Sequence, residues 1–367
     1  MTTHGPGDDP APLRQVLAHC DQVESVPFQA PKAGTAAFAG AVARSWLSPW
    51  PVDLWKWRSP EVIATVRTVA ARTAPDVVVA DFLVGMRNVP AGLTPVVFFA
   101  HNVEYQIWRR LHEVESETWK RWLLAVEWRK MRRAERVACR TAALTVAVSP
   151  DDRDRLQAEA PGARVVDVPT GVDVRYFTPS ATPPVRGRLV FSGAMDWYPN
   201  EDAILHFLDA ILPRVRRVRP DVTLTVVGRN PSAKLREAAT RSDVSVTGTV
   251  DDVRPHVAEG EVYVVPLRVG GGTRLKIFEA LAMGKAVVST GVGAEGLAVD
   301  AGRHLVVADG VEAFADAIVT LLGDPDRRVA LGREGRRLVE ARYSWAPVTR
   351  VFEGHLDRVR AGREGAA

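Results

Sequence analysis

The clearest fold signal in this 367-residue chain is the stretch Val262–Leu297, VYVVPLRVGGGTRLKIFEALAMGKAVVSTGVGAEGL. Its first four residues are apolar or aromatic and end at a proline, as expected of a buried strand. Thr273 then stands where a helix N-cap belongs, apolar residues follow at helical spacing, and Gly284 closes the helix. A second apolar run, 286–290, completes a predicted β-α-β unit.

The first turn of the predicted helix carries two cations, Arg274 and Lys276. The N-terminal end of a helix dipole is positive, so acidic residues are preferred there and a cation is mildly unfavourable. The three glycines of residues 270–272 would let backbone N–H groups approach an anion closely. This combination predicts an anion site, and phosphate is the obvious candidate. The alternative is a tight turn followed by a surface pair between Lys276 and Glu279.

The segment GGGTRLKIFEALAMGKAVVSTGVGAEGL resembles the donor-binding segment of glycosyltransferase family 4. Members of that family are retaining enzymes with the α/β GT-B fold, in which two Rossmann-like, doubly wound domains face each other across a cleft. The resemblance implies that a nucleotide-sugar diphosphate binds at the loop and helix start, at Gly271, Gly272, Thr273, Arg274 and Lys276. Glu279 would bind the ribose hydroxyls. The family often has a second Glu eight residues earlier, and here that position is Gly271, so the sugar contact is unassigned.

Composition narrows the class of protein. A hydrophobic content of 46% and a charged content of 25% are ordinary for a globular protein with two domains. Two cysteines give no disulfide framework, which predicts a reducing, cytoplasmic location. No apolar run is long enough for a membrane span, and a net charge of +4 carries no nucleic-acid signature.

Three parts of the chain are expected from the alternation of strand and helix patterns. Residues 1–178 would form the acceptor-side domain, residues 187–345 the donor-binding domain, and residues 346–367 a helix that crosses back, as in GT-B enzymes. Residues 179–187 are proline-rich and mark the expected boundary. The sequence before residue 28 resembles the end of the second strand, a helix at 12–19 and the third strand of such a domain. We therefore expect that one β-α unit is missing upstream.

His101 directly follows a predicted strand, PVVFFA at residues 95–100. Ligands of α/β folds bind just beyond the carboxyl ends of strands. In family 4 a histidine in a comparable place lies near the donor sugar and the acceptor hydroxyl, which makes His101 the candidate catalytic residue. The alternative is a structural histidine, with Asn102 and Glu104 capping the next helix.

Tryptophans are concentrated in two segments of the predicted first domain. Residues 33–59 contain Trp46, Trp50, Trp55 and Trp57, and a helix or broken pair of helices at 103–140 contains Trp108, Trp119, Trp122 and Trp128 among many basic residues. The simplest interpretation is core packing. The alternative is peripheral contact with the inner face of a membrane, because basic, aromatic helices lie on anionic surfaces.

The predicted second domain opens with a strand at 188–192, then Gly193 and the loop AMDWYPN. Family members commonly place an Arg and a Lys for the diphosphate here, whereas this chain has Ala194 and Asn200. The cationic role would therefore fall to Arg274 and Lys276. Trp197 and Asn200 either contact the donor or cap the helix that begins near residue 201. Arg229 follows a later strand, from which it could reach a base or phosphate.

These observations predict a retaining glycosyltransferase of the hexosyltransferase type. It would move a sugar from a nucleotide diphosphate sugar to a glycan or lipid-linked acceptor, without a metal or other cofactor. The wider text, SGAMDWYPNEDAI with VPLRVGGGTRLK, resembles sugar transferases of bacterial exopolysaccharide and exosortase gene clusters. The alternatives are a non-catalytic nucleotide-sugar-binding scaffold and a GT-B sugar-nucleotide epimerase.

Overall fold

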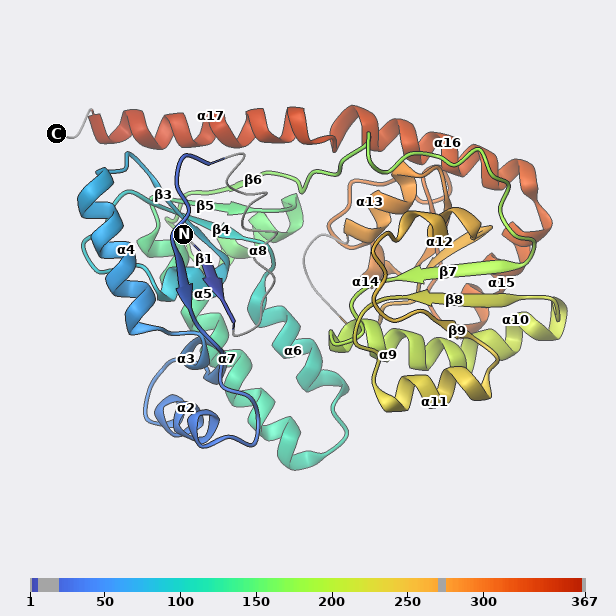
Figure 1. The fold of residues 1–367 in the computed structure, drawn as a ribbon, viewed down its shortest axis with the longest axis horizontal. Helices are drawn as coiled ribbons and strands as arrows, with labels where there is room; N and C mark the ends of the chain where they lie inside the picture. Colours follow the sequence, from blue (N-terminus) through green and yellow to red (C-terminus); the bar gives the residue numbers. More distant parts are fainter. Residues whose placement is uncertain (1, 6–19, 270–274, 365–367) are drawn as a thin grey trace. The chain divides into compact units, whose positions relative to one another are not determined.

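The computed structural model describes residues 2–5, 20–269 and 275–364 of the chain (Figure 1). The chain forms two compact units, Met1–Asp167 with Gly354–Ala367, and Val168–Glu353. The boundary after Asp167 lies before the proline-rich segment 179–187, where the sequence placed it. The reason is that Val172 and Phe177 pack with the second unit. The helix expected at 12–19 and the loop 270–274 lie outside the described residues.

The second unit is built on a six-stranded parallel sheet of order β12-β11-β10-β7-β8-β9. Its strands are β7 (Arg188–Ser192), β8 (Thr223–Val227), β9 (Ser245–Val246), β10 (Val262–Val265), β11 (Ala286–Ser289) and β12 (Val306–Val307). The first three strands run outward in one direction and the last three in the other, which is the doubly wound Rossmann order. The strand order reverses between β7 and β10, so a ligand site is expected at their carboxyl ends.

Both faces of this sheet are buried, which explains why its strands are continuously apolar. On β10, Val262 and Val264 belong to one apolar cluster, whereas Tyr263 and Val265 belong to another. The first cluster includes residues of α9 (Tyr198–His206), its continuation η1 (Phe207–Ile211), α10 (Leu212–Val218), α11 (Ala233–Arg241) and α15 (Val311–Gly323). The second includes α12 (Arg254–Glu259), α13 (Leu275–Ala282) and α16 (Pro325–Arg342).

The predicted β-α-β unit is confirmed. Strands β10 and β11 pair in parallel, and α13 connects them. Gly284 ends α13 with a φ of +67°, the left-handed conformation that glycine adopts without strain. The Lys285 N–H then donates to the Ala280 carbonyl at 3.0 Å. A short helix, α14 (Gly291–Ala294), follows β11.

The first unit contains a four-stranded parallel sheet of order β3-β4-β5-β6. Its strands are β3 (Val78–Asp81), β4 (Val96–Ala100), β5 (Leu144–Ala147) and β6 (Val165–Asp167). A separate parallel pair, β1 (Thr2–His4) with β2 (Ser25–Pro27), matches the two strands expected before residue 28. Helices of this unit include α2 (Ala36–Trp46), α3 (Val52–Lys56), α4 (Pro60–Thr73), α5 (Phe82–Arg87) and α8 (Pro150–Glu159).

The basic, Trp-rich segment is a pair of helices, α6 (Glu104–Val114) and α7 (Thr118–Thr141), which pack side by side (Figure 1). His112 Nδ1 lies 2.8 Å from the Arg121 carbonyl oxygen and joins the two helices near their turn. The last helix, α17 (Trp345–Glu364), starts in the second unit and ends in the first.

Candidate active site

Lys276 lies in the first turn of α13 and points to the end of β7. Its Nζ donates to Asn200 Oδ1 at 2.7 Å and lies 4.1 Å from the centroid of the Phe191 ring. Asn200 is oriented in turn because its Nδ2 donates to the Ala194 carbonyl at 2.8 Å. The ammonium therefore lies at the position where the strand order reverses. An amide oxygen and an aromatic face both stabilise a cation there.

Gly193 leaves the space that this ammonium needs. A Cβ added at Gly193 would lie 2.6 Å from Lys276 Nζ and 2.8 Å from Asn200 Nδ2. At the end of the neighbouring strand, a Cβ on Gly228 would lie 1.8 Å from the Gly193 carbonyl oxygen. Any side chain at Gly193 would displace the lysine, whereas a side chain at Gly228 would force the two strand ends apart.

Glu279 lies one turn after Lys276 on the same helix and is half-buried. Burial raises the pKa of its carboxyl group above the ordinary value, and the charge of Lys276 partly opposes that shift. Because both side chains are half-buried and Lys276 is hydrogen-bonded to Asn200, they are not the exposed surface pair that the sequence left open. The carboxylate is available as a hydrogen-bond acceptor close to the cation.

The other predicted donor residues fall into two groups. Gly271, Gly272, Thr273 and Arg274 lie outside the described residues. Arg229 follows β8, where its Nε lies 3.5 Å from Asp196 Oδ2 and its side chain is 63% exposed. The structure thus brings Gly193 and Lys276 together, and it places Arg229 in an exposed ion pair.

Sequence reasoning missed the ring of Phe191 and the role of Arg268. Arg268 follows β10 and binds Asp202 of α9 through two hydrogen bonds of 3.0 and 2.5 Å. It therefore ties the loop after β10 to the helix that carries Asn200. Its position directly beyond a predicted strand, in VPLR, was the available signal. Of the two residues considered for capping, Trp197 is the N-cap residue of α9, which begins at Tyr198, whereas Asn200 lies inside the helix.

In the first unit, His101 follows β4 and meets Asp81 at the end of β3. His101 Nε2 and Asp81 Oδ1 are 2.6 Å apart. The imidazole also stacks on Phe82, with ring centroids 4.2 Å apart, and contacts the Phe99 ring at 4.8 Å. Phe82 has a φ of +60°, which is a strained conformation for an aromatic residue and turns its ring toward the histidine. Partners on two sides fix the orientation of the imidazole.

Two carboxyl groups lie beside this histidine at the start of α6. Glu135 of α7 is fully buried and accepts the N–H groups of Glu104 at 2.7 Å and Tyr105 at 2.8 Å. It therefore replaces the side-chain cap that the sequence suggested at Asn102 and Glu104. Burial, reinforced by the charge of Asp53, raises the pKa of Glu104 to about 7.

Comparisons with known proteins agree with this architecture. Among solved structures, sucrose-phosphate synthase from Thermosynechococcus elongatus superimposes with a TM-score of 0.72 at 17% identity, covering 92% of this chain and 84% of that one. Anabaena HepE in complex with UDP and glucose gives a TM-score of 0.65 at 15% identity, covering 97% and 91%. The fold class is that of the GT-B glycosyltransferases.

Two family models match the chain. The model described as Glycosyltransferase Family 4 matches residues 14–176, and the model described as Glycosyl transferases group 1 matches residues 186–324. The chain belongs to glycosyltransferase family 4, as its resemblance predicted.

Curated relatives include mannosyltransferases of lipid glycans. The phosphatidyl-myo-inositol mannosyltransferase of Mycolicibacterium smegmatis is 34% identical over 57% of this chain and 56% of its own. A GDP-mannose-dependent monoacylated alpha-(1-6)-phosphatidylinositol monomannoside mannosyltransferase of Corynebacterium glutamicum is 31% identical over 48% and 52%. The chain thus spans little more than half the length of the curated relatives it matches.

Proposed function

We propose that this protein is a retaining glycosyltransferase that moves a hexose from a nucleotide diphosphate sugar to a lipid-linked acceptor. The observation that carries the proposal is the Lys276 ammonium, held by Asn200 and Phe191 beside Gly193 where the strand order of the second unit reverses. A cation at this point of a Rossmann-like sheet suits the diphosphate of a nucleotide.

In the proposed reaction, negative charge builds on the diphosphate as the glycosidic bond breaks. The Lys276 ammonium would stabilise that charge, and it needs little reorganisation because Asn200 already orients it. Arg274 and the backbone of Gly271, Gly272 and Thr273 are proposed to bind the same phosphates. Glu279 would accept hydrogen bonds from the ribose hydroxyls. We propose that side-chain cations act in place of a metal ion.

His101 is proposed to contact the reacting sugar or the acceptor hydroxyl. Asp81 Oδ1 lies 2.6 Å from His101 Nε2 and fixes the orientation of the imidazole. This carboxylate–imidazole arrangement orients a hydrogen-bonding group. Both residues stand at carboxyl ends of neighbouring parallel strands, where α/β folds bind ligands.

Relatives guide the choice of donor and acceptor. Several are described as GDP-mannose-dependent, and their acceptors are phosphatidylinositol mannosides. We therefore propose GDP-mannose as the first donor to test and a lipid-linked glycan as the acceptor class. The exopolysaccharide branch suggested by the sequence stays a prediction.

A thermal-shift screen of nucleoside diphosphates and their sugar conjugates, with and without EDTA, tests this proposal. We expect one base to raise the Tm selectively, with no effect of EDTA. No shift with any nucleotide would contradict the donor site, and a shift abolished by EDTA would contradict the metal-free mechanism. Incubation of the selected donor alone and with lipid acceptors then separates the alternatives: an epimerase converts the donor alone, a scaffold converts nothing, and a transferase needs the acceptor.

A further inference from the structure

Four large apolar side chains of the first unit that are more than half exposed lie on α2, α7 and the turn after α2. The exposed fractions are 56% for Trp46, 90% for Leu47, 61% for Trp119 and 56% for Trp122. The rings of Trp46 and Trp122 contact each other, with centroids 5.8 Å apart. Trp119 lies one turn before Trp122 on α7 and so shares its side of the helix. We call these four residues the aromatic edge.

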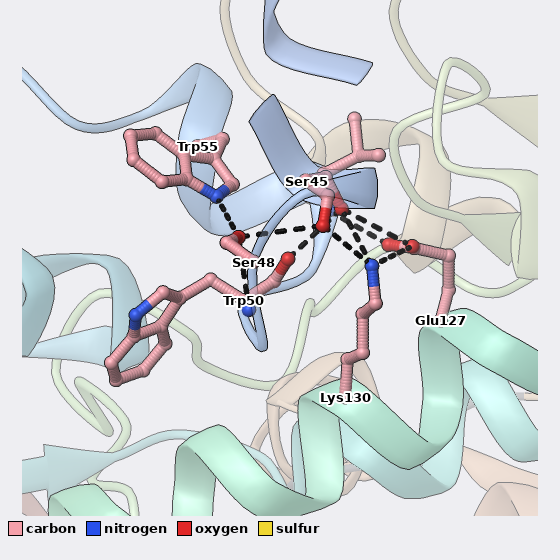
Figure 2. Close-up of polar contacts among 7 residues, drawn as sticks. Ser45, Ser48, Trp50, Trp55, Glu127 and Lys130 are labelled. Atoms are coloured by element: carbon pink, nitrogen blue, oxygen red, sulfur yellow. Dashed lines mark hydrogen bonds and ion pairs between the residues drawn. The ribbon is translucent and has the colours of Figure 1, made fainter. Parts of the chain in front are cut away.

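A polar network ties the segment around Trp46 and Leu47 to α7 (Figure 2). Lys130 Nζ of α7 donates to the Ser45 carbonyl at 2.7 Å, and Ser45 Oγ donates to the Trp50 carbonyl at 2.9 Å. Glu127 Oε2 of α7 accepts the Val52 N–H at 2.7 Å. These bonds tie residues on both sides of Leu47 to α7. The exposure of Trp46 and Leu47 is therefore imposed by a fixed turn and is not the fraying of a helix end.

The same network involves Ser48, which orients the two tryptophans that face inward. Trp55 Nε1 donates to Ser48 Oγ at 2.7 Å, and the Trp50 N–H donates to the same oxygen at 3.3 Å (Figure 2). Trp50 also lies under the Arg87 guanidinium, 4.2 Å from its ring centroid. The segment therefore separates into inward tryptophans with defined partners and outward ones with exposed faces.

Helix α7 is positively charged, whereas Glu115 and Glu117 lie just before it and Trp119 Nε1 donates to Glu117 Oε2 at 3.0 Å. Helix α7 contains eight basic residues and two glutamates, and the two glutamates, Glu127 and Glu135, are bound to backbone N–H groups. Lys120 is paired with Glu117 at 2.5 Å. Arg44 and Arg121, next to the exposed tryptophans, are exposed and form no ion pair within the described parts of the chain. Two uncompensated cations thus flank an apolar edge.

We propose that the aromatic edge docks on an anionic phospholipid surface. Tryptophan is favoured where an apolar ring meets a polar boundary, and arginines next to it add attraction to anionic headgroups. None of the helices in the described ranges is long and apolar enough to cross a bilayer, so this contact is one of lying on the surface. The inference does not depend on the donor site, and it would bring the first unit to lipid-linked acceptors.

Co-sedimentation of the full chain with vesicles tests this inference. Vesicles of neutral phosphatidylcholine are compared with vesicles in which part of that lipid is replaced by anionic phosphatidylglycerol. We expect binding to the anionic vesicles that weakens as salt is added. Trp46→Ser with Trp122→Ser should lower the partition coefficient at least about tenfold, because two indole rings lose their burial at the interface.

Charge reversal gives the second arm of the experiment. Arg44→Glu with Arg121→Glu should reduce binding to anionic vesicles at least about twentyfold, since each basic residue contributes about fivefold and acidic replacements add repulsion. Matched controls are Val218→Ser with Val329→Ser, both exposed apolar residues of the second unit, and Arg67→Glu with Arg140→Glu. The controls should bind like the unaltered chain.

Two results would overturn the inference. The first is equal sedimentation of the unaltered chain and the Trp46→Ser, Trp122→Ser variant while both keep the same Tm. The second is no vesicle binding combined with a concentration-dependent dimer, seen by gel filtration, that the same variant abolishes; the edge would then be an interface between copies. Nucleotide thermal shifts on these variants should be unchanged, so failure here leaves the donor-site proposal intact.

Discussion

Each unit of this protein holds a group of polar residues near the carboxyl ends of its parallel strands, but the two groups differ in charge. In the second unit an ammonium is bound by an uncharged amide and an aromatic face, next to a glycine. In the first unit an imidazole is bound by a carboxylate and packed between aromatic rings. The Lys276 ammonium is thus oriented by an amide oxygen and a ring, whereas the His101 imidazole is oriented by the Asp81 carboxylate.

This difference assigns separate tasks to two similar sheets. An ammonium group at the strand ends is suited to a charged group such as a diphosphate. An oriented imidazole with a carboxylate partner is suited to a neutral hydroxyl, to which it can donate or from which it can accept a proton. Variants in one unit should therefore alter donor affinity, and variants in the other should alter turnover.

The largest effect is expected at His101. His101→Ala should lower kcat of sugar transfer by at least about 100-fold, the usual contribution of a positioned acid or base, with donor affinity unchanged. Asp81→Asn should give a smaller loss, because the imidazole remains but is no longer fixed. Steady-state kinetics with a saturating donor measures both, and His355→Ala serves as a control. If His101→Ala instead weakens donor binding and leaves kcat unchanged, the two units do not have the separate tasks assigned to them.

A smaller effect concerns the pH dependence of stability in the first unit. The pKa of Glu104 is about 7 in the folded chain, above its ordinary value of 4.5. Because the folded state holds the proton more tightly, this group favours folding below pH 4.5, and that contribution is lost as the pH rises toward 7. The loss is at most about 3 kcal/mol, and Glu104→Gln should remove it.

Thermal unfolding between pH 5 and 8 measures this effect. The Tm of the unaltered chain should fall relative to that of Glu104→Gln over this range, by roughly 5 °C or less. Glu237→Gln, an exposed glutamate of the second unit, should run parallel to the unaltered chain. If the Glu104→Gln and unaltered curves are parallel as well, the carboxyl group is already ionised in the folded chain at pH 5.

Much of the fold could be predicted from local patterns. Strand 188–192 and the β10-α13-β11 unit are confirmed, because apolar runs and the glycine that ends α13 are local features. The site was predictable only in part. Asn200 contacts Lys276 across 76 residues of sequence, Phe191 lies farther still along the chain, and Glu135 caps a helix 31 residues earlier. Such partners carry no local signal.

The predicted membrane alternative shows the same limit. The sequence identifies the tryptophans, but their spacing does not show which of them face inward and which face outward. That division depends on Lys130 and Glu127 of α7, which bind backbone groups about 80 residues away in sequence. Only the folded arrangement shows that Trp46 meets Trp122 while Trp55 faces Ser48.

The measurement that tests the central claim most directly is calorimetric titration of the selected nucleoside diphosphate into four proteins. These are the unaltered chain, Lys276→Ala, Glu279→Ala and the control Lys234→Ala, which removes an exposed lysine of α11. We expect Lys276→Ala and Glu279→Ala each to weaken binding by at least about 1 kcal/mol, or fivefold in Kd, with the control unchanged. Unchanged affinity in both variants would contradict the assignment of the donor site to the second unit.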